Sequence, residues 1–211
     1  MIIVTGGIKG GSGKTTIATN IAVMRSASKK VLLVDADEQK SAWDWSQQRD
    51  CLVGDSLKGS FVTVCMSGKS IYSNLCKLKQ DYDDIIIDTG GRDTTSQRAA
   101  LSIADKFILP FKPSSIDVWT MTPIKMILSE CLNSNLKSYA IISQADAVGK
   151  DNQEAIEILK EFPEIITLEF TIGYRRAFRN AAAEGLSIFE MNPADKKACQ
   201  EMQNLYDLIY N

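Results

Sequence analysis

The sequence predicts a single α/β domain over residues 1–211, built on a mostly parallel, twisted β-sheet with helices on both faces. Two observations predict this class: short apolar runs recur along the chain, and stretches long enough for crossover helices separate most of them. Parallel strands covered on both faces give continuous apolar runs, whereas half-exposed strands alternate. No linker rich in Pro, Gly or Ser and no internal repeat divides the chain, which favours one domain.

The expected strands are short runs of β-branched or aliphatic residues. Because a crossover between parallel strands is long and right-handed, the intervening segments are expected to form helices on both sides of one sheet. The runs are IIV from Ile2, VLLV from Val31, FVTV from Phe61, III from Ile85, FIL from Phe107, AII from Ala140 and IITL from Ile165.

The last element is predicted to be a helix with one apolar stripe. Asn192 is the expected N-cap, Pro193 the first helical residue, and Asp195 falls three residues after the cap. The stripe repeats at spacings of four, three and four residues, which is the helical period, and it comprises Ala198, Met202, Leu205 and Ile209.

Composition excludes several classes of protein. The net charge is −2, so any contact with DNA or a membrane must come from a local patch. No apolar run approaches the roughly 18 residues of a membrane span, and the N-terminus begins with a strand where a signal peptide would need a charged and then an apolar region. We therefore expect a cytoplasmic protein.

The chain has no histidine, which excludes Ser-His-Asp and Cys-His catalysis. The cysteines are scattered singly with no C-x-x-C pair, so a zinc site is not expected. We expect buried, reduced thiols at Cys51, Cys65, Cys76, Cys131 and Cys199.

The segment IKGGSGKTT, residues 8–16, predicts a phosphate-binding loop. It follows the first strand and precedes a helix, which is the context that such a loop requires. The glycines let backbone N–H groups close on phosphate oxygens, and the helix N-terminus adds partial positive charge. Lys14 is expected at the β- and γ-phosphates and Thr15 at Mg²⁺, although Ile8 stands where the general pattern has its first glycine. The predicted nucleotide contacts are Lys9, Gly10, Gly11, Ser12, Gly13, Lys14, Thr15 and Thr16.

Carboxylates follow two of the strands. Asp35 and Asp37 end VLLVDAD, and Asp88 ends the strand in IIIDTGG. Ligands of parallel sheets bind at the carboxyl ends of strands, so these side chains are expected to converge on the loop. Asp88 and Asp35, with Thr15, are the candidate metal ligands, and Asp37 is the candidate for orienting the attacking water.

Taken together, KGGSGKTT from Lys9, VDAD from Val34 and IDTGG from Ile87 resemble the ParA/MinD family of deviant Walker ATPases. PFKPSSID, residues 110–117, and AAAEGLSIFE, residues 181–190, extend the resemblance over nearly the whole chain. The resemblance implies a P-loop ATPase that takes ATP and Mg²⁺, is slow without a partner, and forms a homodimer when ATP is bound. It also implies that Lys9 reaches across the dimer to the partner's ATP, where a cation stabilises charge in the transition state.

The densest basic stretch is GYRRAFRN, residues 173–180. In ParA-like proteins, C-terminal basic residues of the ATP dimer bind DNA nonspecifically, and this resemblance makes Arg175, Arg176 and Arg179 candidates for DNA contact. The alternatives are a solvated helix face or arginines that hold the nucleotide or the dimer. If the stretch is helical, Arg175 and Arg179 lie one turn apart.

The resemblance implies a short ParA-type partition ATPase that acts on the nucleoid with a centromere-binding, ParB-like adaptor. One alternative is a MinD-like membrane-cycling ATPase or another cargo-positioning ATPase on the same fold. The other is a metabolic enzyme or a metal-cluster carrier on that fold. The tail from Ala198 has Glu201 and Asp207 but no Lys or Arg, so binding to anionic membrane is not expected.

Overall fold

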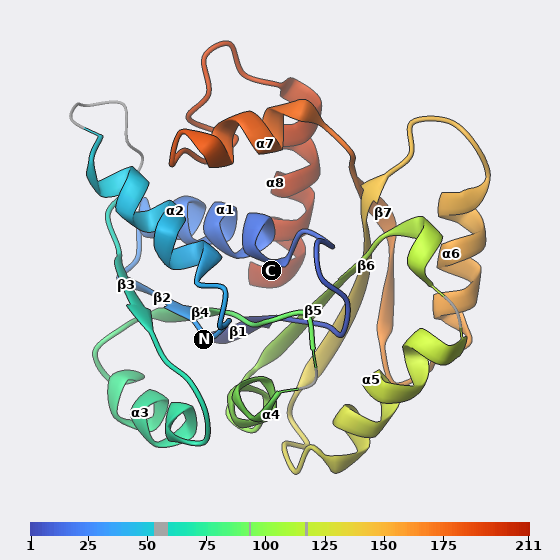
Figure 1. Cartoon of the computed structure of the whole chain (residues 1–211), viewed down its shortest axis with the longest axis horizontal. Coiled ribbons are helices and arrows are strands. Elements are labelled where there is room, and N and C mark those ends of the chain that lie inside the picture. Colours follow the sequence, from blue (N-terminus) through green and yellow to red (C-terminus); the bar gives the residue numbers. More distant parts are fainter. Residues whose placement is uncertain (53–58, 93, 117) are drawn as a thin grey trace.

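The structure is a computed structural model that describes residues 1–52, 59–92, 94–116 and 118–211. A single seven-stranded sheet lies at its centre, with all the paired strands parallel (Figure 1). The strand order is β3-β2-β4-β1-β5-β6-β7. The strands are β1 (Ile2–Thr5), β2 (Val31–Asp35), β3 (Val62–Cys65), β4 (Asp84–Asp88), β5 (Lys106–Phe111), β6 (Lys137–Ala145) and β7 (Ile166–Gly173). Each contains most of the apolar run that predicted it, so the expected fold class is confirmed.

Helices cover both faces of the sheet, and each layer has its own apolar core (Figure 1). One layer comprises α1 (Lys14–Ser26), α2 (Ser41–Asp50), α7 (Arg176–Ala183) and α8 (Lys196–Tyr210). The other comprises α3 (Ser70–Leu78), α4 (Thr95–Leu101), α5 (Val118–Glu130) and α6 (Asp151–Lys160). A short 3₁₀ turn, Pro113–Ser115, follows β5.

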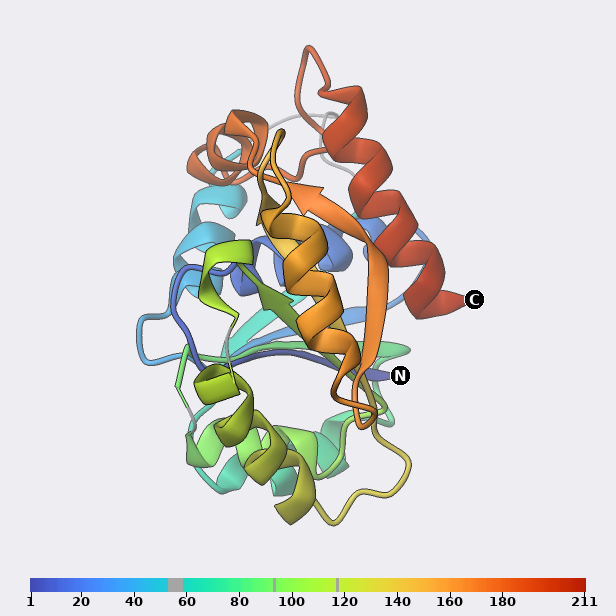
Figure 2. The same cartoon turned by 90° about the vertical axis from the view of Figure 1, so that its right-hand side faces the viewer.

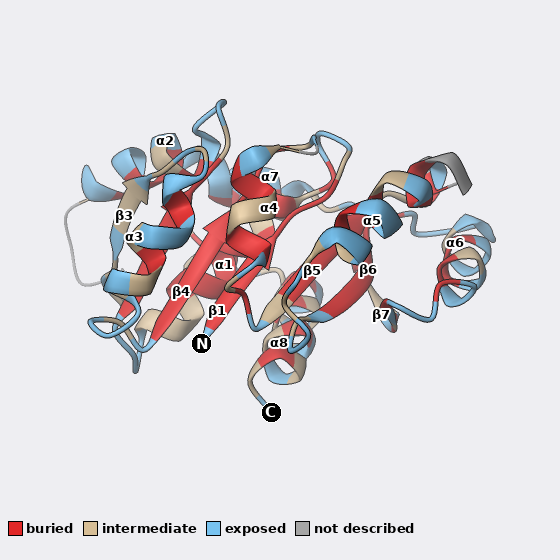
Figure 3. Ribbon diagram, turned by 90° about the horizontal axis from the view of Figure 1, so that it is seen from below, coloured by how far each residue is buried: buried red, intermediate tan, exposed pale blue. Residues whose placement is uncertain are grey.

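The central strands are fully covered, but the edge of the sheet is not. Every residue of β1, β2 and β4 is buried, and Figure 3 shows β1 and β4 as buried ribbon between helices with exposed outer surfaces. By contrast β3, at one edge, has exposed residues at both ends, and Val62 is 48% exposed. β7, at the other edge, is also partly exposed, with Ile166 51% exposed. The expectation that all seven strands are covered on both faces is therefore wrong at β3 and β7, because an edge strand has only one neighbouring strand.

The final helix begins later than the sequence suggested. α8 starts at Lys196, and the carboxylate of Asp195 accepts hydrogen bonds from the N–H groups of Lys197 and Ala198. Asp195 is therefore the N-cap, and the expected cap at Asn192 is wrong because the carboxylate closer to the helix already satisfies its N–H groups. The stripe is confirmed: all four of its side chains are buried, and Figure 2 shows α8 alongside β7.

The sheet brings the functional segments to one edge. β1, β4 and β2 are neighbours in register, so Thr5 lies beside Asp88 and Asp88 lies beside Asp35 at their carboxyl ends. The phosphate loop leaves the same end of β1 and leads directly into α1. Among the described residues, none of the helices has the length and apolar character needed to cross a bilayer.

Candidate functional site

The loop between β1 and α1 depends on glycine at two positions. Gly11 and Gly13 have φ angles of 69° and 96°, in the left-handed region that side chains with a Cβ rarely adopt. A Cβ at Gly13 would also lie 2.7 Å from the Ser143 hydroxyl oxygen. The side-chain amide of Gln144 donates a hydrogen bond to the carbonyl of Gly11 at 2.5 Å. Strand β6, which ends at Ala145, therefore holds the loop in shape from the side.

The two lysines of this loop have different environments. Lys14 is only 6% exposed, and its Nζ donates a hydrogen bond to the carbonyl of Lys9 at 2.9 Å, so it folds under the loop. Burial lowers the pKa of the Lys14 ammonium, and the nearby Asp88 and Asp37 carboxylates oppose that effect. Lys9 itself is exposed. The loop thus places one cation at its floor and another at its outer surface.

Thr15 and Asp88 form the centre of the site. The Thr15 hydroxyl donates to the Asp88 carboxylate at 2.6 Å, and the Thr5 hydroxyl donates to its other oxygen at 3.3 Å. Burial raises the pKa of Asp88 to about 7, and the hydrogen bond from Thr15 partly offsets this. A hydroxyl and a carboxylate side by side are the hard oxygen donors that Mg²⁺ takes when phosphates and water complete its shell. The residues present therefore fit Mg²⁺.

Asp35 is engaged by the backbone that follows it. One carboxylate oxygen accepts from the N–H of Asp37 at 3.0 Å and the other from the N–H of Trp43 at 2.8 Å. Burial raises the pKa of the Asp35 carboxyl, against these backbone hydrogen bonds. Both oxygens therefore hold the segment between β2 and α2, while the side chain of Asp37 lines the open cleft.

The segment after β4 completes the wall opposite α1. A Cβ at Gly91 would lie 2.6 Å from the backbone N of Gly10, so the two glycine-rich segments pack backbone to backbone. At Gly90 the nearest atom would be a carboxylate oxygen of Asp37, at 3.1 Å. The carboxyl ends of β1, β2 and β4 thus enclose one site.

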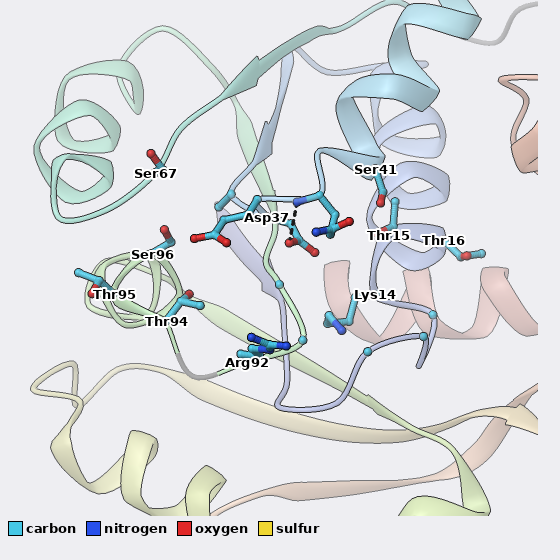
Figure 4. Close-up of a pocket in the computed structure, with 18 of the residues that line it drawn as sticks. Lys14, Thr15, Thr16, Asp37, Ser41, Ser67, Arg92, Thr94, Thr95 and Ser96 are labelled. Atoms are coloured by element: carbon cyan, nitrogen blue, oxygen red, sulfur yellow. Dashed lines mark hydrogen bonds between the residues drawn. The ribbon is translucent and has the colours of Figure 1, made fainter.

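These segments surround a cleft of about 1140 Å³. Figure 4 shows Lys14 and Thr15 on one side, Asp37 between, and Arg92 reaching toward Lys14 from the segment after β4. The Ser12 hydroxyl is buried and has no hydrogen-bond partner within the described residues, as expected of a donor set that awaits phosphate oxygens. Of the predicted nucleotide contacts, Gly10, Gly11, Gly13, Lys14, Thr15 and Thr16 line this cleft.

A smaller cavity of about 290 Å³ adjoins the cleft. The two share Gly13, Thr16 and Gln144, so they meet at the start of α1. The walls of the smaller cavity are mainly apolar and come from α1, the end of β6, β7, α7 and the segment between β7 and α7. They include Ile17, Ile172, Tyr174, Phe178, Arg179 and Ala182.

The arginine-rich stretch divides into two environments. Arg175 precedes α7 with extended backbone, and its guanidinium pairs with Glu201 of α8 at 2.5 Å. Arg176 and Arg179 lie on α7 and are exposed, and the Arg179 guanidinium lies 5.3 Å from the Tyr174 ring centroid. The expectation that Arg175 and Arg179 occupy one turn of a helix is wrong, because the helix begins one residue later.

The cysteines correct another expectation. Cys51 and Cys65 are exposed and the other three are half-buried, and all five are free thiols. The expectation of buried thiols is therefore wrong, because Cys51 follows α2 and Cys65 lies on the edge strand. Within the described ranges, no group of three or more His, Cys, Asp or Glu side chains could hold a metal ion.

Some residues of the cleft were not singled out from the sequence. Arg92 comes shortly after β4 and Gln144 is the next-to-last residue of β6, so a position at the carboxyl end of a strand was the only available signal for either. Hydroxyl side chains from the start of α2, the segment before α3 and the start of α4 also line the cleft; they are Ser41, Ser67, Thr94, Thr95 and Ser96.

This geometry defines a P-loop nucleotide-binding protein: glycine loop, buried lysine, hydroxyl and carboxylate at the carboxyl ends of parallel strands. Residues 2–188 match the family described as the CobQ/CobB/MinD/ParA nucleotide binding domain. The chain belongs to this family. It is an ATPase of this family.

Three similar proteins place the chain within the family. The Maintenance of carboxysome distribution protein A of Halothiobacillus neapolitanus is 30% identical over 209 residues, covering 96% of this chain and 93% of that protein. The structure of Cyanothece apo McdA has a TM-score of 0.79 at 19% identity, over 99% and 98% of the two chains. A putative plasmid partition protein of Borrelia burgdorferi B31 bound to AMPPNP has a TM-score of 0.75 at 22% identity, over 99% and 97%. At these identities the two structures show the shared fold.

Proposed function

We propose that this ATPase is a positioning switch. Mg-ATP closes two copies into a sandwich dimer, the dimer binds DNA without sequence preference, and an adaptor protein attached to the cargo stimulates hydrolysis and release. The observation that carries the proposal is the separation of the two loop lysines: Lys14 is buried beneath the loop, whereas Lys9 is exposed on its outer side. A lysine in that position is placed to reach the nucleotide of a second subunit.

The proposal assigns a separate role to each of the main residues of the site. Lys14 and the backbone of residues 10–16 hold the phosphates, and Thr15 and Asp88 hold the metal ion. Mg²⁺, when bound, neutralises charge on the β- and γ-phosphates. Asp37 orients the attacking water, and Lys9 of the other copy stabilises the charge that develops on the transferred phosphoryl group.

Asp35 holds the backbone of Asp37 and of the first turn of α2 in place. Since both of its oxygens accept backbone hydrogen bonds, we assign it to positioning Asp37 and the start of α2 in preference to direct metal binding. The smaller cavity beside the phosphate loop has apolar walls and the amide of Gln144, which suit a purine base. Tyr174 of this cavity is our candidate for contact with the adenine.

The proposed DNA surface is α7. Arg176 and Arg179 are exposed there, while Arg175 is paired with Glu201 and holds α7 against α8. In a dimer the surface is present twice, giving four arginines that can contact phosphates. Nucleoid association follows from this surface.

The cargo is proposed from the relatives. A full-length relative at 30% identity is described as maintaining carboxysome distribution, which favours a large protein assembly as cargo. Plasmid segregation through a ParB-like adaptor is the alternative, supported by the fold of the Borrelia protein. A membrane cycle is disfavoured, because the apolar stripe of α8 is buried in the core and its residues are therefore unavailable to lipid.

The test is binding to random-sequence duplex DNA without nucleotide, with ADP, and with a non-hydrolysable ATP analogue plus Mg²⁺. Wild type should bind only in the analogue state. Lys9→Ala should retain analogue binding by the monomer but lose both dimerisation and DNA binding. Arg176→Ala/Arg179→Ala should dimerise normally and bind DNA weakly, whereas Lys77→Ala/Lys79→Ala on the opposite layer should behave as wild type.

Salt dependence sharpens the test. Each phosphate contact contributes about 0.9 to the slope of log affinity against log salt, so loss of four contacts per dimer should reduce the slope by up to about 3.6. Analogue-dependent dimers that bind no DNA at any salt concentration would refute the DNA part of the proposal. Binding that is equal in all nucleotide states would refute the switch.

A further inference from the structure

The arginine helix α7 ends in a tight turn, residues 185–190, that contacts both helices leading away from the nucleotide cleft. We call this segment the junction turn. Its sequence is GLSIFE, a segment whose role the site leaves unexplained. Figure 1 shows α7 on the same side of the sheet as α1 and α2.

The first contact joins the junction turn to α2. Arg49, near the end of α2, makes two hydrogen bonds of 2.8 Å to the carboxylate of Glu190 and one of 3.3 Å to the carbonyl of Gly185. Arg49 is 6% exposed at its side chain and Glu190 is fully buried. A buried ion pair with this geometry is rigid, because separating it would leave an uncompensated charge inside the protein.

Backbone packing reinforces that contact. A Cβ at Gly185 would lie 2.6 Å from the backbone N of Arg49 and 2.9 Å from the carbonyl carbon of Gln48. The turn therefore sits directly against the last turn of α2 without an intervening side chain. Any shift of α2 must be accompanied by a shift of the turn.

The second contact joins the junction turn to α1. The side chain of Asn20, which is 4% exposed, accepts a hydrogen bond from the N–H of Ile188 at 2.8 Å. Its amide nitrogen donates to the carbonyl of Thr16 at 2.7 Å. Asn20 thus links the turn to the first turn of α1, whose residues Thr15 and Thr16 line the cleft.

Both connected helices begin at the nucleotide. α1 starts at Lys14 in the phosphate loop, and α2 starts four residues after Asp37, with its first turn held by the carboxylate of Asp35. A helix transmits displacement along its axis because its backbone hydrogen bonds resist compression. A displacement of Asp37 would therefore reach the junction turn through α2, and a displacement of the phosphate loop would reach the same turn through α1.

We propose that the junction turn couples the state of the nucleotide to the orientation of the arginine helix α7. Arg49, Glu190 and Asn20 are its positioning residues: they touch neither nucleotide nor DNA, and they fix where Arg176 and Arg179 point. This inference rests on the proposed function, since it assigns how the DNA-binding surface is regulated.

The test measures the linkage between ligands. The coupling factor is the ratio of DNA affinity with the non-hydrolysable ATP analogue to that with ADP. ADP carries the same base, so the ratio removes any direct effect of the base cavity on α7. The variants are Asn20→Ala and the double change Arg49→Met/Glu190→Leu, which removes the ion pair without leaving a lone buried charge.

Each variant should lower the coupling factor at least tenfold, while the affinity of the DNA-free protein for the analogue changes less than threefold. The matched control is Arg98→Met/Glu130→Leu, which removes an ion pair between α4 and α5 on the opposite layer and should leave the coupling factor unchanged. A folded variant that retains the wild-type coupling factor would overturn the inference, since a merely structural ion pair would lower stability without changing the ratio.

A second measurement needs no DNA. Hydrogen exchange of residues 176–190 in wild type should slow on binding the ATP analogue relative to ADP, and Asn20→Ala should reduce that difference. Unchanged exchange in this segment would refute the junction role. If exchange responds but no DNA binds in any state, the DNA part of the proposed function fails, while the coupling between the nucleotide and the orientation of α7 is retained.

Discussion

Removing the charge of Asp88 is predicted to stabilise the nucleotide-free protein. Asp88 is completely buried between β1 and α1, and burial raises its pKa from 3.8 to about 7. At about 1.4 kcal/mol per pH unit, this difference corresponds to about 4 kcal/mol of folding free energy that the ionised carboxylate costs. Asp88→Asn keeps an oxygen that can accept the hydrogen bond from Thr15, so the charge is the main thing removed.

The sign of the pH dependence follows from the direction of the pKa. The folded protein holds the Asp88 proton more tightly than the unfolded chain, so this group lowers stability progressively as pH rises from about 4 to about 7. Above pH 7 the carboxyl is ionised in both states and the full cost is present. Asp88→Asn should therefore add about 2–4 kcal/mol of stability at pH 8 and less than about 1 kcal/mol at pH 4.5.

The assay is urea unfolding with EDTA and without nucleotide, at pH 4.5, 6 and 8, comparing midpoints at equal slope. Asp81→Asn, at an exposed carboxylate before β4, is the control and should change little at any pH. A variant no more stable than wild type at pH 8, or a gain that does not vary with pH, would refute the reasoning. The same variant should lose Mg-dependent nucleotide binding, because the metal site loses its carboxylate.

Three further substitutions have definite expected outcomes. Asp37→Asn should lower ATP turnover about 100-fold or more while analogue-dependent dimers persist, as measured by phosphate release and sedimentation. Gly185→Ala should cost about 2–5 kcal/mol in urea unfolding, since its φ of 69° is left-handed and a Cβ would meet the backbone of α2. Met202→Ala, in the buried stripe of α8, should cost about 2–5 kcal/mol, whereas the exposed Met126→Ala should cost far less.

The fold was predictable because its signals are local. Seven apolar runs identified the strands, and the spacing between them implied helical crossovers, so the parallel sheet followed. What the runs could not reveal is the spatial order of the strands: β3 is an edge strand although its run resembles the others. Its exposure depends on a missing neighbour, which no property of Val62 or its flanking residues encodes.

The phosphate loop was predictable for the same reason, since its residues are consecutive. Arg92 and Gln144 were missed because they lie far from the phosphate loop in the sequence. They line the cleft only because the order of the strands in the sheet brings their segments beside that loop. The junction turn was equally hidden: Arg49 and Glu190 are 141 residues apart, and neither belongs to a local pattern. The sequence showed that residues 181–190 resemble the ParA/MinD family, but it did not show which residues they contact.

The three aspartates show where reasoning from position alone reaches its limit. Asp35, Asp37 and Asp88 lie at or just beyond the carboxyl ends of β2 and β4, so the sequence assigns all three to the metal and its water. Their hydrogen bonds separate them. Asp35 uses both oxygens on backbone N–H groups, Asp88 shares its oxygens with two hydroxyls, and Asp37 lines the cleft with its own backbone fixed by Asp35. Backbone N–H groups cannot bind a metal ion, so the Asp35 carboxylate that they hold positions its neighbours; the Thr15 hydroxyl that donates to Asp88 is itself a metal donor, so that pair fits the ion. Asp35→Asn should therefore impair hydrolysis through Asp37 while sparing nucleotide binding more than Asp88→Asn does.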